Sequence, residues 1–246
     1  MPPPSPTTPR QLILEWTNEL APAFDNFLAG KNVEVVAHLR EFAAGRFGVS
    51  SLLLWGAPGG GKSHLLHATV AEARRRGRIA IAIRHEDEMD AAAAEAQALY
   101  ALDDVNRLSP AGQGRLFTFY NACRDAGAQL LLAAAMPAAR APLREDLRTR
   151  IGAGLILEVQ SLADEDKPAA LAAYAREQGF RLSAEVIDFL LTRGRRDMPT
   201  LLSNLRALDR YSMSSKRQVT VPLVKELLGP KLVPIEVKTT PGKAAG

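Results

Sequence analysis

The feature that most constrains this chain is a glycine-rich loop between a short apolar run and a helical stretch. The run Ser51–Trp55 leads into Gly56-Ala-Pro-Gly-Gly-Gly-Lys-Ser63, which fits the pattern G-x-x-x-x-G-K-[ST]. In such loops the glycines let successive main-chain amides curl around a phosphate group, and the following helix directs its positive end at the same anion. The sequence therefore predicts a phosphate-binding loop that joins a strand to a helix.

Two side chains of this loop and two carboxylates elsewhere predict the chemistry of the site. We expect Lys62 to place its charge on the β- and γ-phosphate oxygens and Ser63 to offer its hydroxyl to Mg²⁺. The apolar stretch Ala98–Leu102 ends in Asp103 and Asp104. Because a carboxylate at the C-terminal end of a parallel strand faces the same crevice, we assign Asp103 to Mg²⁺ through water and Asp104 to positioning the attacking water.

Short apolar runs alternate with helical stretches from residue 24 to residue 160. This alternation predicts an α/β fold in which helices flank a parallel sheet. The predicted strands are Ser51–Trp55, Arg78–Ile83, Ala98–Leu102, Gln129–Ala135 and Leu155–Gln160. The helices predicted between them are Lys62–Arg76, Glu86–Gln97, Gln113–Ala126 and Leu143–Arg150.

After Ser161 the pattern becomes entirely helical. Ser183 and Asp197 are the expected N-caps of two of these helices. The predicted helices are Asp164–Gln178, Ala184–Arg193, Met198–Tyr211 and Thr220–Leu228. We therefore expect a flexible tail over residues 1–20, a nucleotide-binding base domain over 21–160, a small all-helical lid domain over 161–229 and a loose tail over 230–246.

Composition excludes several classes of protein. The single cysteine, Cys123, excludes an internal disulfide and a cysteine-based metal cluster, and it fits a reducing cytoplasm. No stretch approaches the roughly 18 apolar residues of a membrane helix, and the first ten residues do not resemble a secretory signal. A net charge of +4 allows contact with nucleic acid without requiring it.

Three further side chains have chemistry but no evident partner. His64 and His67 lie three positions apart on the predicted helix after the loop. Since no third ligand is evident, we interpret them as packing residues rather than a metal pair. Cys123 lies in a helical stretch without a recognisable base and is expected in the core.

Four segments, taken in order, resemble the AAA+ module of the DnaA family of bacterial replication initiators. These segments are Ala23–Gly30, Gly61–Ala68, Leu102–Asp104 and Leu147–Leu155. The similarity spans about residues 24–228. It implies an AAA+ base domain with a helical lid, bound ADP or ATP, and Mg²⁺ held by Ser63 and Asp103. The nucleotide-binding residues that it implies are Gly56, Ala57, Pro58, Gly59, Gly60, Gly61, Lys62, Ser63 and His64.

Two features shift the resemblance toward the Hda-like regulatory branch of this family. The initiator carries a helix-turn-helix domain after its lid, and we expect none here because the chain ends close to that point. Gln11-Leu-Ile-Leu-Glu-Trp16 resembles the peptide that binds the replicative sliding clamp, the beta subunit of DNA polymerase III. Leu14 and Trp16 would enter an apolar pocket while Gln11 fixes register, with Leu12 part of the motif. The other interpretation is a short strand or helix start that packs on the domain.

Arg150 matches the family's arginine finger. A guanidinium inserted into a neighbour's site stabilises charge on the γ-phosphate, and such fingers contribute about 10³–10⁵ in rate. Arg148 is two positions away, so it faces elsewhere on a helix. Without the resemblance, Arg150 would be interpreted as a solvated or ion-paired surface residue.

Two positions depart from the family pattern. The polar residue that senses the γ-phosphate near the end of the fourth strand corresponds to Ala135. The arginine that begins the third lid helix and reaches the nucleotide corresponds to Pro199, and Arg195 or Arg196 could compensate. These losses predict weak intrinsic ATP hydrolysis, with Asp104 contributing weakly, and are compatible with ADP binding.

Together these observations predict a negative regulator of replication initiation. The protein would bind the clamp, reach DNA through it, and promote ATP hydrolysis by the DnaA initiator. A homo-oligomer is left open and no membrane contact is expected. One alternative is an AAA+ ATPase that acts on DNA or in helicase loading with its own turnover. Another is an adaptor that binds clamp and initiator without chemistry.

Overall fold

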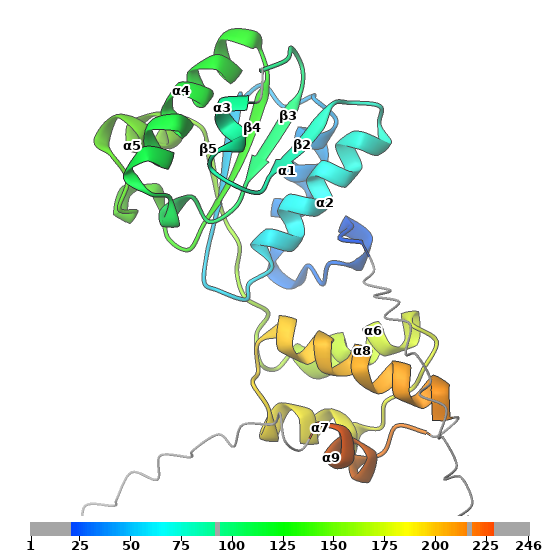
Figure 1. Cartoon of the computed structure of the whole chain (residues 1–246). Coiled ribbons are helices and arrows are strands. Elements are labelled where there is room, and N and C mark those ends of the chain that lie inside the picture. Colours follow the sequence, from blue (N-terminus) through cyan, green and yellow to red (C-terminus); the bar gives the residue numbers. More distant parts are fainter. Residues whose placement is uncertain (1–20, 92–93, 216–217, 229–246) are drawn as a thin grey trace, which may run out of the picture.

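A five-stranded parallel sheet organises the N-terminal part of the molecule (Figure 1). This structure, a computed structural model, describes residues 21–91, 94–215 and 218–228. The strands lie in the order β2-β3-β4-β1-β5. Their bounds are β1 Ser51–Trp55, β2 Ala80–Ile83, β3 Leu99–Leu102, β4 Gln129–Ala134 and β5 Leu155–Glu158. The order brings the ends of β1, β3 and β4 next to one another at one edge of the sheet.

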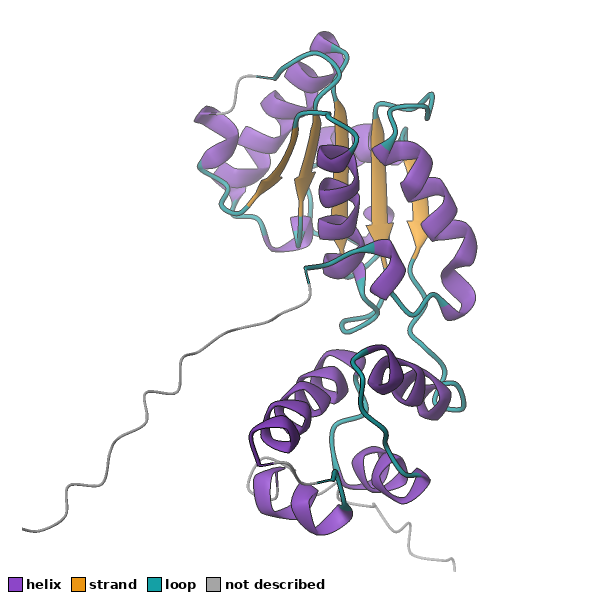
Figure 2. Ribbon diagram, turned by 90° about the vertical axis from the view of Figure 1, so that its right-hand side faces the viewer, coloured by secondary structure: helices purple, strands orange, loops and turns teal. Residues whose placement is uncertain are grey.

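Helices cover both faces of this sheet (Figure 2). Successive residues of a strand point to opposite faces, so Leu52 and Leu54 pack with α1 and α2 whereas Leu53 packs with α4 and α5. The helices are α1 Val33–Ala43, α2 Lys62–Arg75, α3 Glu88–Ala91, α4 Pro110–Ala126 and α5 Glu145–Gly152. Short 3₁₀ turns are found at Phe24–Asn26, Gly30–Asn32, Val105–Arg107 and Ala138–Arg140.

The C-terminal part is a separate helical layer with its own core. Leu171, Leu190, Leu201, Leu205 and Leu208 are buried there against one another. The helices are α6 Lys167–Glu177, α7 Ala184–Arg193, α8 Met198–Ser215 and α9 Val221–Leu228. The predicted fold class, a parallel sheet flanked by helices and followed by a small helical lid, is confirmed.

Side-chain caps explain where several of these helices begin. The Ser183 hydroxyl accepts a hydrogen bond from Val186 N, and the Asp197 carboxylate accepts one of 3.0 Å from Thr200 N. Both were predicted as N-caps. The Ser109 hydroxyl caps α4 in the same way, followed by Pro110 at the first helical position.

Two helices differ from the sequence prediction. Helix α1 was not predicted, although Val35, Leu39 and Phe42 are buried at helical spacing. The predicted helix Glu86–Gln97 is wrong in extent, because among the residues of this range that the structure describes (86–91 and 94–97) only Glu88–Ala91 is helical. The Glu86 carboxylate accepts a 2.6 Å hydrogen bond from Ser109, which fixes it at the start of α4.

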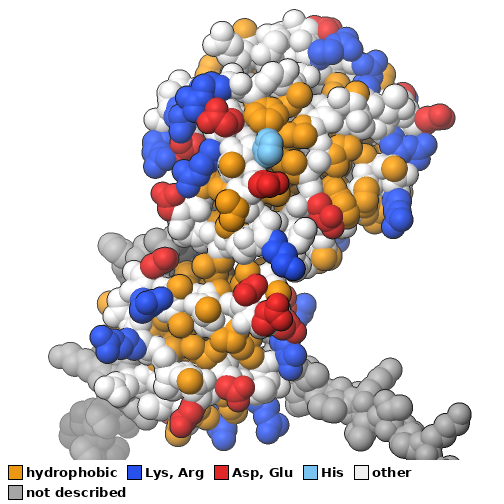
Figure 3. All heavy atoms as spheres, turned by 180° about the vertical axis from the view of Figure 1, so that it is seen from behind, with side chains coloured by type: hydrophobic (Ala, Val, Ile, Leu, Met, Phe, Trp, Pro, Cys, Tyr) orange, Lys and Arg blue, Asp and Glu red, His pale blue; other side chains and the backbone are white. Residues whose placement is uncertain are grey.

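The two parts meet through the segment that follows β5. Asn32, which is buried, donates from its side-chain amide to Gln160 O and accepts from Gln160 N, both at 2.8 Å. Seen from behind, apolar side chains gather in the middle of each part and charged ones toward the rims (Figure 3). None of the helices that the structure describes is long and apolar enough to cross a membrane.

Candidate functional site

The glycine-rich loop lies between β1 and α2, as predicted, and packs against the start of the lid segment. A Cβ at Gly56 would lie 2.3 Å from Val159 O, so the loop and the end of β5 require a glycine at this contact. Gly61 has a φ of 96°, and a Cβ there would lie 2.6 Å from Phe27 Cε2. Both glycines therefore let the loop pack closely against neighbouring parts of the protein, and this packing fixes the path of the loop.

Lys62 begins α2 with its side chain buried under the loop. Its Nζ donates hydrogen bonds to Gly56 O at 2.8 Å and to Ala57 O at 3.0 Å. Burial lowers the pKa of the Lys62 ammonium, and the nearby carboxylates of Asp103 and Asp104 partly oppose that shift. The ammonium has main-chain carbonyls rather than a direct carboxylate partner, so it is poised to bind an anion beside it.

The two predicted carboxylates follow β3 at the same edge of the sheet. Asp103 Oδ1 accepts a 2.8 Å hydrogen bond from Asp104 N. Asp104 has a φ of 49°, which is strained for a residue with a side chain. The described residues contain no group of three or more His, Cys, Asp or Glu side chains that could hold a metal ion. A Mg²⁺ here would therefore depend on Ser63, Asp103 and phosphate oxygens.

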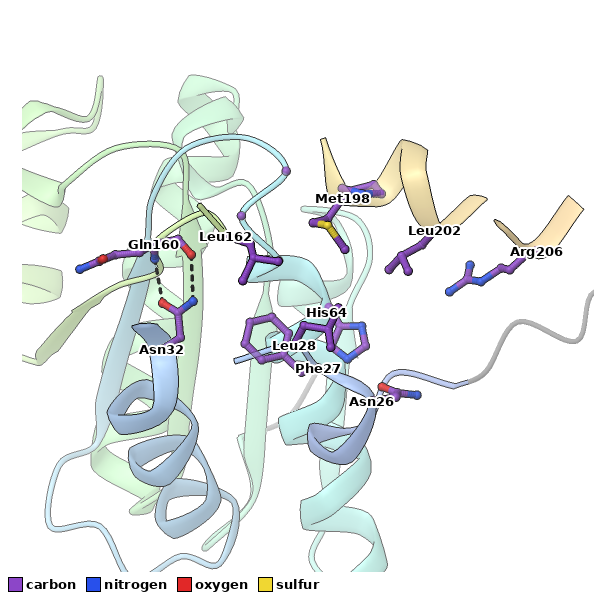
Figure 4. Close-up of a pocket in the computed structure, with 14 residues that line it drawn as sticks. Asn26, Phe27, Leu28, Asn32, His64, Gln160, Leu162, Met198, Leu202 and Arg206 are labelled. Atoms are coloured by element: carbon purple, nitrogen blue, oxygen red, sulfur yellow. Dashed lines mark hydrogen bonds between the residues drawn. The ribbon is translucent and has the colours of Figure 1, made fainter. Parts of the chain in front are cut away.

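A cavity of about 250 Å³ extends from the loop into the gap between the sheet and the lid (Figure 4). Gly59, Gly60 and Gly61 form its phosphate-loop end. Its remaining wall is largely apolar, with a few polar groups, as is typical of nucleotide pockets. The other lining residues are Asn26, Phe27, Leu28, Asn32, His64, Gln160, Leu162, Met198, Pro199, Leu202 and Arg206. A glycine cradle that continues into an apolar cavity fits a nucleotide.

His64 lies on the wall of this cavity rather than in a metal site. Its Nε2 is 2.9 Å from Ala23 O, and its ring lies 5.6 Å from the Phe27 ring, centroid to centroid. Burial lowers the pKa of His64, the hydrogen bond to Ala23 opposes that shift, and Arg206 and His67 add to it. The lowered pKa favours the neutral form of this imidazole at neutral pH.

Ala135 and Pro199, the two positions that depart from the family pattern, lie close to the nucleotide-binding elements. Ala135 contacts the turn that follows β3, and Pro199 lies beside the phosphate loop. Ala135 N donates a 2.8 Å hydrogen bond to Asn106 Oδ1, so a side-chain amide from the turn after β3 reaches the end of β4. Pro199 lines the cavity at the glycine end.

Neither of the arginines considered as compensation lines this cavity, but Arg196 lines a neighbouring cavity together with Pro58 and Gly59 of the loop. Arg195 Nε lies 3.1 Å from Asp197 Oδ2. Arg196 donates to Leu191 O at 2.8 Å and lies 3.6 Å from Asp164.

Arg150 lies in the last turn of α5, away from this cavity. Its guanidinium carbon is 4.6 Å from the centroid of the Phe117 ring, and the Tyr120 hydroxyl donates a 3.0 Å hydrogen bond to Arg150 O. Both aromatic residues belong to α4. The half-buried guanidinium is therefore held on the surface of the base and does not reach the phosphate loop of its own chain.

The predicted clamp-binding residues and three cavity residues differ in how the structure describes them. Gln11, Leu12, Leu14 and Trp16 lie outside the described residues. Asn32, Leu202 and Arg206 line the cavity but were not predicted to be part of it. Arg206 follows Pro199 by seven positions, two helical turns, and this spacing is the signal that could have identified it.

Comparisons with known proteins identify the family. A family profile described as "Hda, lid domain" matches residues 164–228. An uncharacterized protein of Haemophilus influenzae is 33% identical over 213 residues, covering 83% of this chain and 92% of that protein. The match covers nearly the full length of this relative, so the similarity includes both the sheet and the lid.

Solved structures share the fold. Domain III of the Thermotoga maritima replication initiation protein DnaA has a TM-score of 0.71 at 19% identity, covering 86% of this chain and 97% of that one. AMPPCP-bound DnaA from Aquifex aeolicus has a TM-score of 0.64 at 21% identity, covering 79% and 69%. A Thermotoga maritima RuvB mutant has a TM-score of 0.63 at 19% identity, covering 85% and 72%.

Proposed function

We propose that this chain, which belongs to the Hda-like family of DnaA-homologous AAA+ proteins, is a negative regulator of replication initiation. It binds nucleotide, is tethered to the sliding clamp, and promotes hydrolysis of ATP held by the DnaA initiator. The observation that carries this proposal is the position of Arg150. Its guanidinium rests on α4 and is absent from the cavity that contains its own chain's loop, as a finger for another molecule must be.

The chemistry expected of Arg150 is electrostatic. A guanidinium placed at the γ-phosphate of a neighbour's ATP stabilises the negative charge that develops there during hydrolysis. A gain of about 10³–10⁵ in rate corresponds to ~4–7 kcal/mol of barrier. Two contacts support this role. The Tyr120 hydroxyl fixes the main chain of Arg150 through its carbonyl oxygen, and the Phe117 ring holds the guanidinium on the surface of α4.

The nucleotide of this chain itself would be held by residues Gly56 to His64, with Ser63 and Asp103 at Mg²⁺. AMPPCP is bound by a DnaA of the same fold, and the glycine cradle and buried Lys62 support a nucleotide site here. The bound group would supply a diphosphate that fixes the loop and the lid together. We favour ADP, because Ala135 and Pro199 bring no charged or polar side chain toward a γ-phosphate, and we expect weak intrinsic turnover.

The clamp tether is a proposal from the sequence alone. The segment from Gln11 to Trp16 precedes the first described residue, Ala21, by a few positions. A clamp pull-down tests it with Gln11→Ala and Leu14→Ala, and both variants should lose retention on the clamp. Retention equal to that of the wild type would refute the tether while leaving the proposed role of Arg150 intact.

The central experiment measures ATP hydrolysis by purified initiator in the presence of clamp loaded on DNA. The wild-type chain should stimulate hydrolysis, and Arg150→Ala should remove most of the stimulation. Arg148→Ala is the matched control, because it removes the same charge from the same helix at a position that faces elsewhere. Equal stimulation by the wild type and Arg150→Ala would reject the finger and favour a pure adaptor.

The second candidate is an AAA+ ATPase that acts on DNA or in helicase loading. Its support is the intact set of Lys62, Ser63, Asp103 and Asp104 around the loop. Substantial DNA-stimulated ATP turnover by the isolated protein would favour this function over the first.

A further inference from the structure

Arg206 is a positively charged residue in the cavity wall that has no role in the functions proposed above for the phosphate loop and for Arg150. It lies on α8, and its side chain points from that helix into the cavity, toward the side where His64 lies (Figure 4). The same cavity is lined at its other end by Gly59, Gly60 and Gly61. Arg206 therefore belongs to the lid's contribution to the site.

The guanidinium of Arg206 is only partly satisfied by the protein. Its Nε donates a 3.1 Å hydrogen bond to the Tyr174 hydroxyl, which holds the plane of the group. Within the part of the chain that the structure describes, no carboxylate forms an ion pair with Arg206. The side chain is half-buried and its neighbour in the wall is the apolar Leu202. A guanidinium in such surroundings gains from a planar or hydrogen-bond-accepting ligand.

The position of Arg206 along α8 indicates which end of a nucleotide it would meet. Pro199 is next to the phosphate loop, since a Cβ at Gly59 would lie 3.9 Å from Pro199 Cδ. Seven residues of helix separate Arg206 from Pro199, a distance of about 10 Å along the axis. Arg206 is thus displaced from the phosphates, toward the end of the cavity where His64 lies.

We propose that Arg206 binds the nucleoside end of the nucleotide, with its guanidinium against the base or the ribose. This inference rests on the proposed nucleotide site and adds to it a residue from the lid. A planar guanidinium packs on aromatic rings and donates hydrogen bonds to hydroxyl and ring-nitrogen acceptors. Because the contact is with the nucleoside, it serves ADP and ATP alike. Lid and base are thereby linked through the ligand irrespective of the γ-phosphate.

The test is calorimetric titration of ADP and ATP into the wild type, Arg206→Gln and Arg206→Lys. Arg206→Gln should weaken both nucleotides by roughly tenfold, and by the same factor. Arg206→Lys keeps the positive charge but loses the planar group. Its affinities for ADP and ATP should lie between those of the wild type and those of Arg206→Gln. Arg210→Gln is the matched control, because it changes an exposed arginine one turn further along α8 and should leave both affinities unchanged.

Thermal unfolding without nucleotide separates binding from folding. The proposal predicts that Arg206→Gln melts close to the wild type while its nucleotide-induced rise in melting temperature is smaller. Unchanged affinities for a folded Arg206→Gln would overturn the proposal, and so would a loss confined to ATP, which would mark a γ-phosphate contact. If Arg206→Gln does not fold, unchanged affinities in Arg206→Lys overturn it. A wild type that binds neither nucleotide would instead remove the proposed nucleotide site itself.

Discussion

The hydroxyl of Tyr120 donates a hydrogen bond of 3.0 Å to the carbonyl oxygen of Arg150. The same hydroxyl lies 2.9 Å from Ser51 Oγ, and since its proton is directed at Arg150, the serine is the donor in that pair. One side chain of α4 therefore connects the first residue of β1 to the last turn of α5, which carries the proposed finger.

Removal of this hydroxyl should weaken both the fold and the presentation of Arg150. Tyr120→Phe loses one buried and one partly buried hydrogen bond and should lower the free energy of unfolding by about 1–3 kcal/mol. It should also lower the maximal stimulation of the initiator's ATPase. The concentration of variant that gives half of this stimulation should stay similar to that of the wild type, because the variant still binds the initiator. Denaturant unfolding and a titration of the ATPase assay measure the two effects.

Tyr100→Phe is the control for this prediction. Tyr100 is buried on β3, and its hydroxyl accepts a 3.0 Å hydrogen bond from Glu95 N rather than bonding the main chain of Arg150. It should lose stability but keep full stimulation. Equal losses of stimulation in both tyrosine variants would show that Tyr120 acts through stability alone.

The side chain of Asn32 fixes the segment between sheet and lid. Asn32→Ala leaves the main chain of Gln160 without its two partners and should cost about 1–3 kcal/mol of stability. Asn32→Asp keeps an acceptor for Gln160 N but places a buried carboxylate oxygen against Gln160 O, so its cost should be at least as large as that of alanine. Hydrogen exchange at residues 159–162 should be faster in both variants than in the wild type. Unchanged exchange in the alanine variant would contradict this role.

The half-buried His64 should make stability depend on pH below neutrality. Its pKa in the folded protein lies below the usual 6.5, chiefly because of burial. The unfolded chain therefore takes up a proton at a higher pH than the folded one. The resulting stability is present above about 6.5 and is lost as the pH falls through that value toward the folded pKa.

The melting temperature should therefore drop between pH 7.5 and pH 5.5, and drop less in His64→Asn. His67→Asn, altered on the exposed side of the same helix, should retain the wild-type dependence. Identical pH profiles for the wild type and His64→Asn would count against this assignment.

The single cysteine should be chemically inert in the folded protein. Cys123 is buried in the core, and burial raises the pKa of its thiol to about 12. A thiol reagent at pH 8 should react only after denaturant is added, because the reactive thiolate is absent from the native state. Rapid modification of the native protein would contradict the packing of α4.

The sequence predicted the strands and most lid helices because their signals are local. Apolar runs mark buried parallel strands, and Ser183 and Asp197 cap helices within three residues of themselves. The helix over Glu86–Gln97 failed because a tertiary contact decides the outcome there. The Glu86 carboxylate binds Ser109, and Gln97 adopts a φ of 60° just before β3.

The site was only partly predictable for the same reason. The loop and its carboxylates follow a fixed spacing, so they could be identified without a structure. Asn32 and Arg206 reach the cavity from segments far apart in the chain, one before β1 and one on the third lid helix. Only the folding of the lid over the sheet brings them together.

The claim on which the rest depends is that the loop from Gly56 to Ser63 holds an adenine nucleotide. Titration of ADP with Mg²⁺ into the purified protein, with Lys62→Ala as the comparison, tests it most directly. We predict saturable binding by the wild type and at least tenfold weaker binding by the variant. A wild-type protein that takes up neither ADP nor ATP at millimolar concentration, while remaining folded, would contradict the claim.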